Sequence, residues 1–327
     1  SRARRKTATL SLLITALLLL VLAGCENLFN NNDDEEMEES GVPVIPSEYQ
    51  GNQGALPSTV SASPPNDTYY DEQWALPAIN APAAWGIVTD AQLGPRFGPV
   101  VVAVLDSLVD VDHPDLDDNI AAGGWDFYRD RSIEDVLAIG VAPDEHGTHV
   151  AGIIAAVFDN RIGVAGIGKN LLEILPVRVL PDAYSGGSAS DLMAGLLYAA
   201  GLTDGKRPPR VARVVNMSLG TRGVIPVGTD DHIFEKAIND VARTGVVMVA
   251  ASGNGDDTTL DYPAAYSAVL SVGSVDESDT GFVRSTFPSE PGAGSTYGPN
   301  LDLVAPGGYG VAGNGILSTT PDRSLGE

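Results

Sequence analysis

The feature that most constrains the fold is a succession of short, continuously apolar runs separated by helical segments. Strand-like runs occupy residues 99–105, 174–179, 211–217, 245–251, 269–275 and 301–304. Helical patterns occupy residues 147–157, 190–200 and 232–243. Strands that are buried on both faces have this continuous apolar character, and their alternation with helices indicates a parallel sheet. We therefore expect an α/β domain of three αβα layers around a mostly parallel central sheet.

The first 25 residues have the composition of a secretory signal. Four of the five residues at positions 2–6 are basic, residues 10–22 are almost wholly apolar, and small residues lead to Cys25. The apolar run is shorter than the roughly 20 residues of a transmembrane helix. Its ending resembles the bacterial lipoprotein signal, in which the cysteine is lipidated. We expect an exported lipoprotein held at the membrane through Cys25, on the cell surface or periplasmic side, with an uncleaved anchor as the alternative.

Residues 26–66 form a linker by composition. An acidic run at 30–39 is followed by stretches rich in Pro, Ser and Gly, without apolar periodicity. Such a segment cannot bury a core, so we expect disorder. The predicted organisation is a signal peptide at 1–25, a linker at 26–66 and one large domain at 67–327.

The net charge of −24 argues against nucleic acid as a partner, because an acidic surface repels phosphates. The acidity either aids solubility or suits a calcium-rich or saline setting. Cys25 is the only cysteine, which rules out an intramolecular disulfide within the 327 residues. We expect a monomer.

Three polar residues fall where a parallel sheet places its active site, beyond the carboxyl ends of the strands. Asp106 ends the run at 99–105, His146 opens the helix near 147, and Asn254 follows the run at 245–251. His146 and His149 are also spaced as a possible metal pair. No HExxH arrangement, second cysteine or third ligand accompanies them, so we do not favour that interpretation.

The motifs around these residues resemble those of the subtilisin-like serine proteases, most closely the thermitase type, over about residues 66–327. The matching strings are Val104-Leu105-Asp106-Ser107, His113-Pro114-Asp115-Leu116, His146-Gly147-Thr148-His149-Val150-Ala151-Gly152, Asn216-Met217-Ser218-Leu219-Gly220, Gly253-Asn254 and Ala305-Pro306-Gly307. The resemblance implies a subtilisin-like fold and a serine endopeptidase.

The resemblance also implies the roles of individual residues. His146 would be the general base, Asp106 would orient its ring, and Asn254 would donate to the oxyanion. Residues of two further segments would bind extended polypeptide substrate: Ser218, Leu219 and Gly220 by strand addition, and Ala251, Ser252 and Gly253 by lining the pocket for the side chain before the scissile bond.

Two departures from the family pattern stand out. Leu108 occupies a position where the family usually has Gly, which would be strained if the backbone there has a positive φ. The family nucleophile lies in Gly-Thr-Ser-Met-Ala, and this string is absent. Ser318 and Ser324 lie near the expected position but lack the right neighbours. We therefore expect the nucleophile to follow Glu327 and this chain to be inactive alone. The alternative is a catalytically dead subtilase scaffold that serves as a binding lipoprotein.

The thermitase-like resemblance further implies a structural Ca²⁺ site. Its side-chain ligands would be Asp67, Asp115 and Asn160, and its carbonyl ligands Val157, Ile162 and Val164. Oxygen ligands from separate segments suit Ca²⁺. Asp67 and Asn160 as plain turn residues are the alternative. A second family site near Asp126 is not expected, because Arg129 and Arg131 fall where carboxylates would help.

Overall fold

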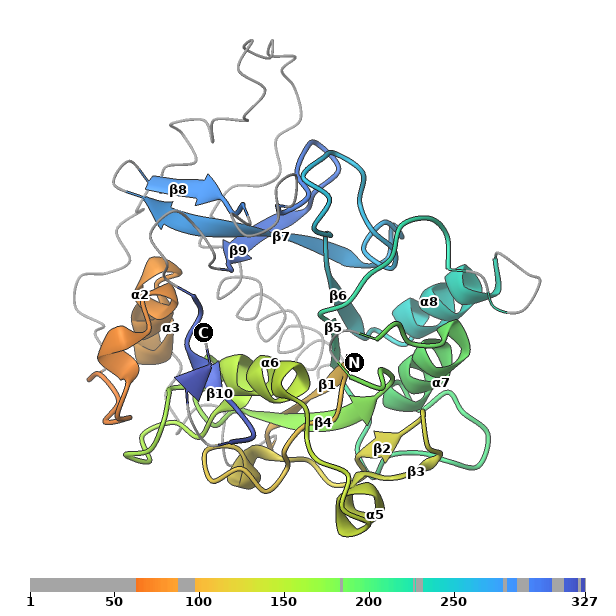
Figure 1. Cartoon of the computed structure of the whole chain (residues 1–327), viewed down its shortest axis with the longest axis horizontal. Coiled ribbons are helices and arrows are strands. Elements are labelled where there is room, and N and C mark those ends of the chain that lie inside the picture. The colour runs from red at the N-terminus through yellow and green to blue at the C-terminus, as the bar shows by residue number, and fades with distance from the viewer. Residues whose placement is uncertain are drawn as a thin grey trace, which may run out of the picture.

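The computed structural model describes residues 63–87, 98–182, 185–225, 227, 232–278, 281–286, 294–307, 315–322 and 325–326 (Figure 1). The predicted signal peptide, with Cys25, and the predicted linker up to residue 62 lie outside these ranges. None of the helices within them combines the length and apolarity needed to span a bilayer.

A nine-stranded sheet forms the centre of the domain. Its strands are β1 (Val100–Asp106), β2 (Trp125–Asp126), β3 (Arg131–Ser132), β4 (Leu172–Arg178), β5 (Val214–Met217), β6 (Val247–Ala251), β7 (Leu270–Ser278), β8 (Gly281–Arg284) and β9 (Leu303–Pro306). They pair in the order β3-β2-β4-β1-β5-β6-β7-β8, with β9 also on β7. Only the β2–β3 and β7–β8 pairs are antiparallel. The mostly parallel sheet is thus confirmed.

The remaining elements surround this sheet. They are η2 (Tyr70–Glu72), α2 (Ala75–Ala78), α3 (Ala81–Ile87), η3 (Asp117–Asn119), α5 (Ile133–Ala138), α6 (Glu145–Ala155), α7 (Ala189–Ala199), α8 (Ile233–Arg243) and the small pair β10 (Ser318–Thr319) and β11 (Leu325–Gly326). Figure 1 shows α6 on one side of the sheet and α7 with α8 on the other.

Strand β1 shows why the apolar runs are continuous. Val101, Ala103 and Leu105 pack into the core under α7 and α8, whereas Val102 and Val104 pack into the core under α6. Alternate side chains point to opposite faces of a strand, so a strand covered on both faces needs apolar residues throughout. The three-layer αβα architecture predicted from the sequence is confirmed.

Leu108 takes up its position without the backbone strain considered above. It is fully buried and is not among the residues with positive φ. Its side chain packs with Ile133 and Val136 of α5 in a small separate core. Its carbonyl accepts a 2.7 Å hydrogen bond from the Asp144 amide, which ties it to the start of α6. Leu108 therefore joins two segments that flank Asp106.

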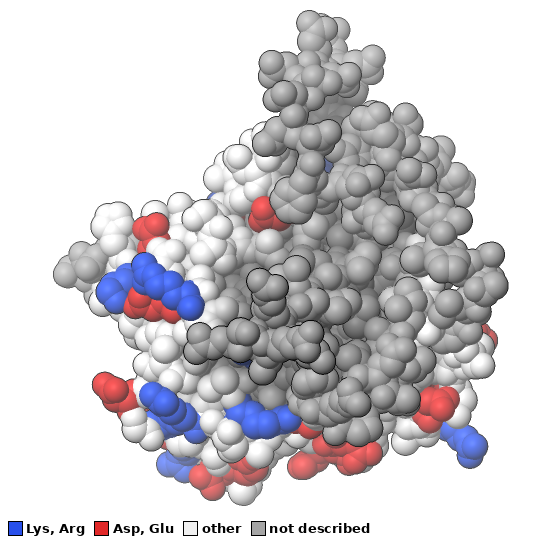
Figure 2. Space-filling view, turned by 180° about the vertical axis from the view of Figure 1, so that it is seen from behind, with Lys and Arg blue, Asp and Glu red and all other residues white. Residues whose placement is uncertain are grey.

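On the rear face, Lys and Arg side chains lie beside Asp and Glu side chains over the described part of the surface (Figure 2). Ion pairs occur at the surface of the described residues, such as Lys236 with Asp240 at 2.6 Å. Exposed pairs contribute little to stability, typically below about 1 kcal/mol. The buried cores, rather than the charged surface, hold the layers together.

Candidate active site

Asp106 and His146 meet where β1 ends beside the start of α6. Asp106 is the last residue of β1, and His146 lies in the first turn of α6. Asp144 is the N-cap of α6, and its side chain accepts a 3.0 Å hydrogen bond from the His146 amide. This cap fixes the helix start, so that His146 Nδ1 lies 2.7 Å from Asp106 Oδ1.

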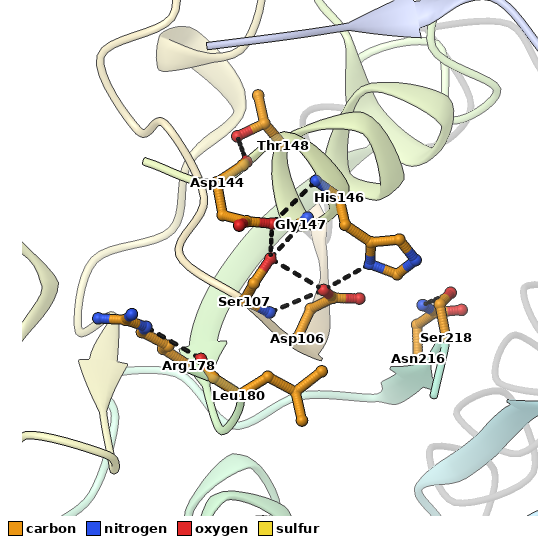
Figure 3. A network of polar contacts seen from close by, with 10 residues as sticks. All are labelled: Asp106, Ser107, Asp144, His146, Gly147, Thr148, Arg178, Leu180, Asn216 and Ser218. Atoms are coloured by element: carbon orange, nitrogen blue, oxygen red, sulfur yellow. Dashed lines mark hydrogen bonds and ion pairs between the residues drawn. The ribbon is translucent and has the colours of Figure 1, made fainter. Parts of the chain in front are cut away.

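A serine hydroxyl connects the two carboxyl groups of this site (Figure 3). Ser107 Oγ lies 2.6 Å from Asp144 Oδ1 and 3.2 Å from Asp106 Oδ1, and it accepts a 3.0 Å hydrogen bond from the Gly147 amide. A Cβ atom on Gly147 would lie 2.6 Å from the Ser107 carbonyl oxygen, so glycine permits this close approach. These contacts therefore fix the end of β1 against the start of α6.

The electrostatics of His146 follow from these contacts. The hydrogen bond to Asp106 raises the pKa of His146; burial opposes this rise, and the charges of Asp106 and Asp144 add to it. Asp106 is fully buried, whereas the His146 side chain is 42% exposed. Because Asp106 can accept only from Nδ1–H, the neutral ring presents Nε2 as a free acceptor. The pair is arranged as the base and orienting carboxylate of a nucleophile-activating site.

The predicted substrate segment lies on the same edge of the sheet. Ser218, Leu219 and Gly220 follow β5, which pairs in parallel with β1 and with β6. Ser218 and Leu219 are half-buried and Gly220 is exposed. Asn216 donates a 2.9 Å hydrogen bond to Ser218 Oγ (Figure 3).

The predicted pocket segment and oxyanion donor follow the end of β6. Ala251 and Asn254 are exposed, and Gly253 has a φ of +115° that disfavours a side chain. Ser252 is buried, and its hydroxyl lies 3.3 Å from the Thr296 carbonyl oxygen. Ser252 therefore holds the segment in place, and its side chain does not point into open space. Since β1, β5 and β6 run parallel, their carboxyl ends bring Asp106, Ser218 and Asn254 to one edge.

The structure also brings together the side chains of the predicted Ca²⁺ site. Asp67 accepts 3.0 Å hydrogen bonds from the amides of Asp159 and Asn160. Asp115 accepts from the Asn160 side-chain amide at 2.7 Å and from the Val164 amide at 2.9 Å. Burial raises the pKa of Asp115 to about 7, because a desolvated carboxylate lacks a balancing charge.

The donor set fits a hard cation. Within the described ranges, no hydrogen bond reaches the carbonyl oxygens of Val157, Ile162 or Val164. Two buried carboxylates, one amide and these carbonyls are the kind of ligand that Ca²⁺ prefers. Within the described residues, no three or more His, Cys, Asp or Glu side chains come together to hold a metal, and this donor set contains only two carboxylates.

Two other expectations concern residues near these sites. Asp126 is fully buried and lies 2.9 Å from Arg178 Nη1, so an internal guanidinium balances the charge of this carboxylate. His149 Nε2 lies 2.8 Å from the Ile316 carbonyl oxygen, while His146 bonds to Asp106. Nothing in the described residues supports a His146–His149 metal pair.

Sequence reasoning did not single out Ser107, Asp144 or Arg178. Asp144 could have been found as an N-cap candidate, since an Asp directly before a helix is a recognised start signal. Ser107 and Arg178 act through contacts between segments far apart in the chain, for which the sequence gives no local signal.

Comparison with known proteins shows the family to which the chain belongs. The family profile of Peptidase S8, the subtilase family, matches residues 98–326. The chain therefore belongs to the subtilase family.

Individual relatives agree with this assignment. Thermitase from Thermoactinomyces vulgaris is 35% identical over 258 residues, which cover 79% of this chain and 76% of thermitase. Subtilisin Savinase from Lederbergia lenta is 36% identical, covering 72% and 71% respectively. The thermophilic serine proteinase of Bacillus sp. (strain AK1) is 37% identical, but the chain spans only 51% of its length. A solved protease from Pseudoalteromonas arctica PAMC 21717 superposes with a TM-score of 0.59 at 32% identity, covering 81% of each chain.

The Ser107 bridge generates a prediction about Asp144. Asp144→Asn keeps the helix cap, since Asn caps as well as Asp, but it removes a negative charge near His146. The pKa of His146 should fall, and the acid limb of the activity profile should move to lower pH, because the base works only when neutral. NMR titration of the His146 ring measures the first effect in this chain directly.

Glu145→Gln is the matched control for this variant. It makes the same change in charge one residue closer in sequence, but at an exposed position where solvent screens it. Equal shifts in the two variants, or no shift in Asp144→Asn, would contradict the role assigned to Asp144.

Proposed function

We propose that this chain carries the catalytic apparatus of an exported serine endopeptidase that hydrolyses extended polypeptides. The observation that carries the proposal is the 2.7 Å contact between buried Asp106 and His146, which leaves His146 Nε2 free at the edge of the sheet. Membership of the subtilase family supports the reaction class.

The chemistry follows from the positions of these groups. His146 Nε2 takes the proton of a serine hydroxyl as it attacks the peptide carbonyl, then returns it to the leaving amine. Asp106 keeps the ring in the required tautomer and stabilises the imidazolium. The Asn254 amide donates to the oxyanion as charge develops on it. Ser218 to Gly220 offer main-chain hydrogen bonds to an extended substrate.

We propose that the nucleophilic serine lies outside these 327 residues. The family motif Gly-Thr-Ser-Met-Ala does not occur among the 327 residues. Assays of activity therefore use the product of the complete gene. A folded product that cleaves no peptide would instead support a binding protein on a subtilase scaffold.

In that complete protein, His146→Ala should remove nearly all hydrolysis, because base and nucleophile act as a unit. Asn254→Ala should lower kcat by roughly 10²–10³ with little change in KM. Steady-state kinetics on a chromogenic peptide measure both effects. His232→Ala, at an exposed position at the start of α8, is the control. A main effect of Asn254→Ala on KM would be incompatible with an oxyanion role.

We also propose Ca²⁺ as a structural cofactor held by Asp67, Asp115, Asn160 and the carbonyls of Val157, Ile162 and Val164. The ion would neutralise two buried carboxylates and join the residues around Asp67 to the loop after α6. Support comes from the hydrogen bonds that link both Asp67 and Asp115 to Asn160, and from the raised pKa of Asp115.

Chelation should then lower the Tm of the chain. Saturation at 100 times Kd adds about 2.7 kcal/mol of stability, since only the folded state binds. Asp115→Asn should abolish the calcium response, whereas Asp117→Asn, an exposed carboxylate two residues away, should retain it. Differential scanning calorimetry with and without EDTA provides the measurement. An identical response of wild type and Asp115→Asn would refute this site.

Export and anchoring complete the proposal. The signal-like residues 1–25 with Cys25 support a lipid anchor, and one relative, from Natrialba magadii, is named an extracellular serine protease. Residues 26–66 would be a tether that reaches roughly 35 Å as a coil, from about 5–6 Å × √n.

Mass spectrometry of the native protein tests the anchor. We expect a mature N-terminus at Cys25 carrying acyl chains, and release of the protein from membranes in Cys25→Ser. A mature N-terminus near Asn66 without lipid would show that the linker is a removed pro-segment.

A further inference from the structure

A carboxylate lies between the two segments proposed to bind substrate. Thr221 and Tyr262 exchange backbone hydrogen bonds of 2.9 and 2.8 Å, which place Gly220 beside Asp261. A Cβ atom on Gly220 would lie 3.1 Å from Asp261 Cβ and 3.7 Å from its Oδ2. A Cβ atom on Gly253 would lie 2.6 Å from both Cγ and Oδ2 of Asp261. The carboxylate therefore faces two residues without side chains, one from each segment.

The polar atoms at this place are incompletely satisfied. The Asp261 side chain is only 14% exposed, and its amide is fixed by a 2.9 Å hydrogen bond to the Ser252 carbonyl oxygen. Thr296 Oγ1, which would lie 3.0 Å from a Cβ atom on Gly253, is buried. Within the described residues, Thr296 Oγ1 has no hydrogen-bond partner, and Asp261 Oδ1 has an ion-pair contact with Arg222 but no hydrogen bond. Such atoms are costly to leave unpaired, and a donor from a ligand would satisfy them.

Arg222 only partly balances the charge of Asp261. Its Nε lies 2.9 Å from Asp261 Oδ1 without the alignment of a hydrogen bond. The same guanidinium contacts Asp257 Oδ1 at 3.1 Å and donates to the Thr259 carbonyl at 2.6 Å. Arg222 is the cation whose charge acts on Asp261, and Asp257 is the neighbouring carboxylate.

The single guanidinium of Arg222 therefore pairs with both Asp257 and Asp261, so the net charge around Asp261 remains negative. Burial raises the pKa of Asp261, the charge of Arg222 lowers it, and the charge of Asp257 raises it. A second cation near Asp261 would find an electrostatic partner that Arg222 does not saturate.

We propose that Asp261 selects substrates with a cationic side chain, Lys or Arg, at the residue before the scissile bond. The inference rests on the endopeptidase function proposed above and deepens it. The stem of the side chain would pass over the bare backbone of Gly220 and Gly253, and its charged end would reach Asp261 and Thr296. An apolar side chain in the same place would cover Asp261 and Thr296 without pairing them, which disfavours it.

The experiment compares peptide substrates that differ only in this residue. The complete protease is assayed on 4-nitroanilides of one peptide ending in Lys, Arg, Phe or Leu. We expect kcat/KM to be highest for Lys and Arg. Asp261→Asn should lower the Lys-to-Phe ratio of kcat/KM at least about tenfold. Asp257→Asn, which removes an equal charge from the same network but does not face the glycines, should change the ratio much less.

Arg222→Gln provides an independent test in the opposite direction. Removing the competing cation should raise the Lys-to-Phe ratio, whereas a purely structural pair of Arg222 and Asp261 would only lose stability. This variant keeps the proposal falsifiable if Asp261→Asn fails to fold.

Benzamidine binding tests the pocket in this chain without requiring hydrolysis. Calorimetric titration should show binding to the wild type and loss of binding in Asp261→Asn. Hydrolysis with an unchanged Lys-to-Phe ratio in Asp261→Asn, or benzamidine binding that survives this substitution, would overturn the inference while leaving the endopeptidase intact. Failure to cleave any peptide, together with Asp261-dependent benzamidine binding, would overturn the proposed function and leave the cationic pocket standing.

Discussion

The hydrogen bond between Asp106 and His146 is the interaction on which the arrangement of the site depends. A fully buried carboxylate is unfavourable unless it is paired. Here Asp106 accepts from the His146 ring and from the backbone and hydroxyl of Ser107. These contacts exist only if β1 pairs with β4 and β5 in the observed register and α6 starts at Asp144. The sheet, the helix cap and the catalytic pair thus require one another.

Three buried carboxylates of this molecule, those of Asp106, Asp126 and Asp115, have different kinds of polar partner. Asp106 forms hydrogen bonds with His146 and Ser107, and Asp126 forms an ion pair with the guanidinium of Arg178. Asp115 has only amide donors and keeps a raised pKa, which is why a metal ion suits it. Because guanidinium and Ca²⁺ are alternative sources of positive charge, a site that contains the one has less need of the other.

Much of this organisation could be predicted from the sequence, and the reason is periodicity. The apolar run at 99–105 specified a strand buried on both faces, and β1 occupies Val100–Asp106. The pattern at 147–157 predicted a helix opened by His146; α6 runs over Glu145–Ala155, with His146 in its first turn. The short strands β2 and β3 were missed, because two residues carry no recognisable period.

What the sequence could not show was contact between distant segments. In the sequence, Leu108 is a departure from the family glycine, and the structure shows that its side chain packs against α5. In the sequence, Ser107 is a neighbour of Asp106, and the structure shows that its hydroxyl donates a hydrogen bond to Asp144. No local pattern singles out Asp261 in the sequence, and the structure shows that its side chain lies next to both Gly220 and Gly253. Each of these depends on packing that only the folded chain determines.

The guanidinium of Arg222 lies directly over the backbone of Gly255, where any Cβ atom would overlap it. Gly255 is the residue after Asn254, so the side chain of Arg222, two residues beyond the proposed substrate segment, covers the loop of the proposed oxyanion donor. Because the guanidinium is the flexible end of its side chain, a side chain at 255 would displace it rather than be excluded by it. This displacement would weaken the contacts of Arg222 with Asp257 and Asp261. A single substitution at 255 would thus alter the charge around Asp261 while Asp106, His146 and Asn254 stayed the same.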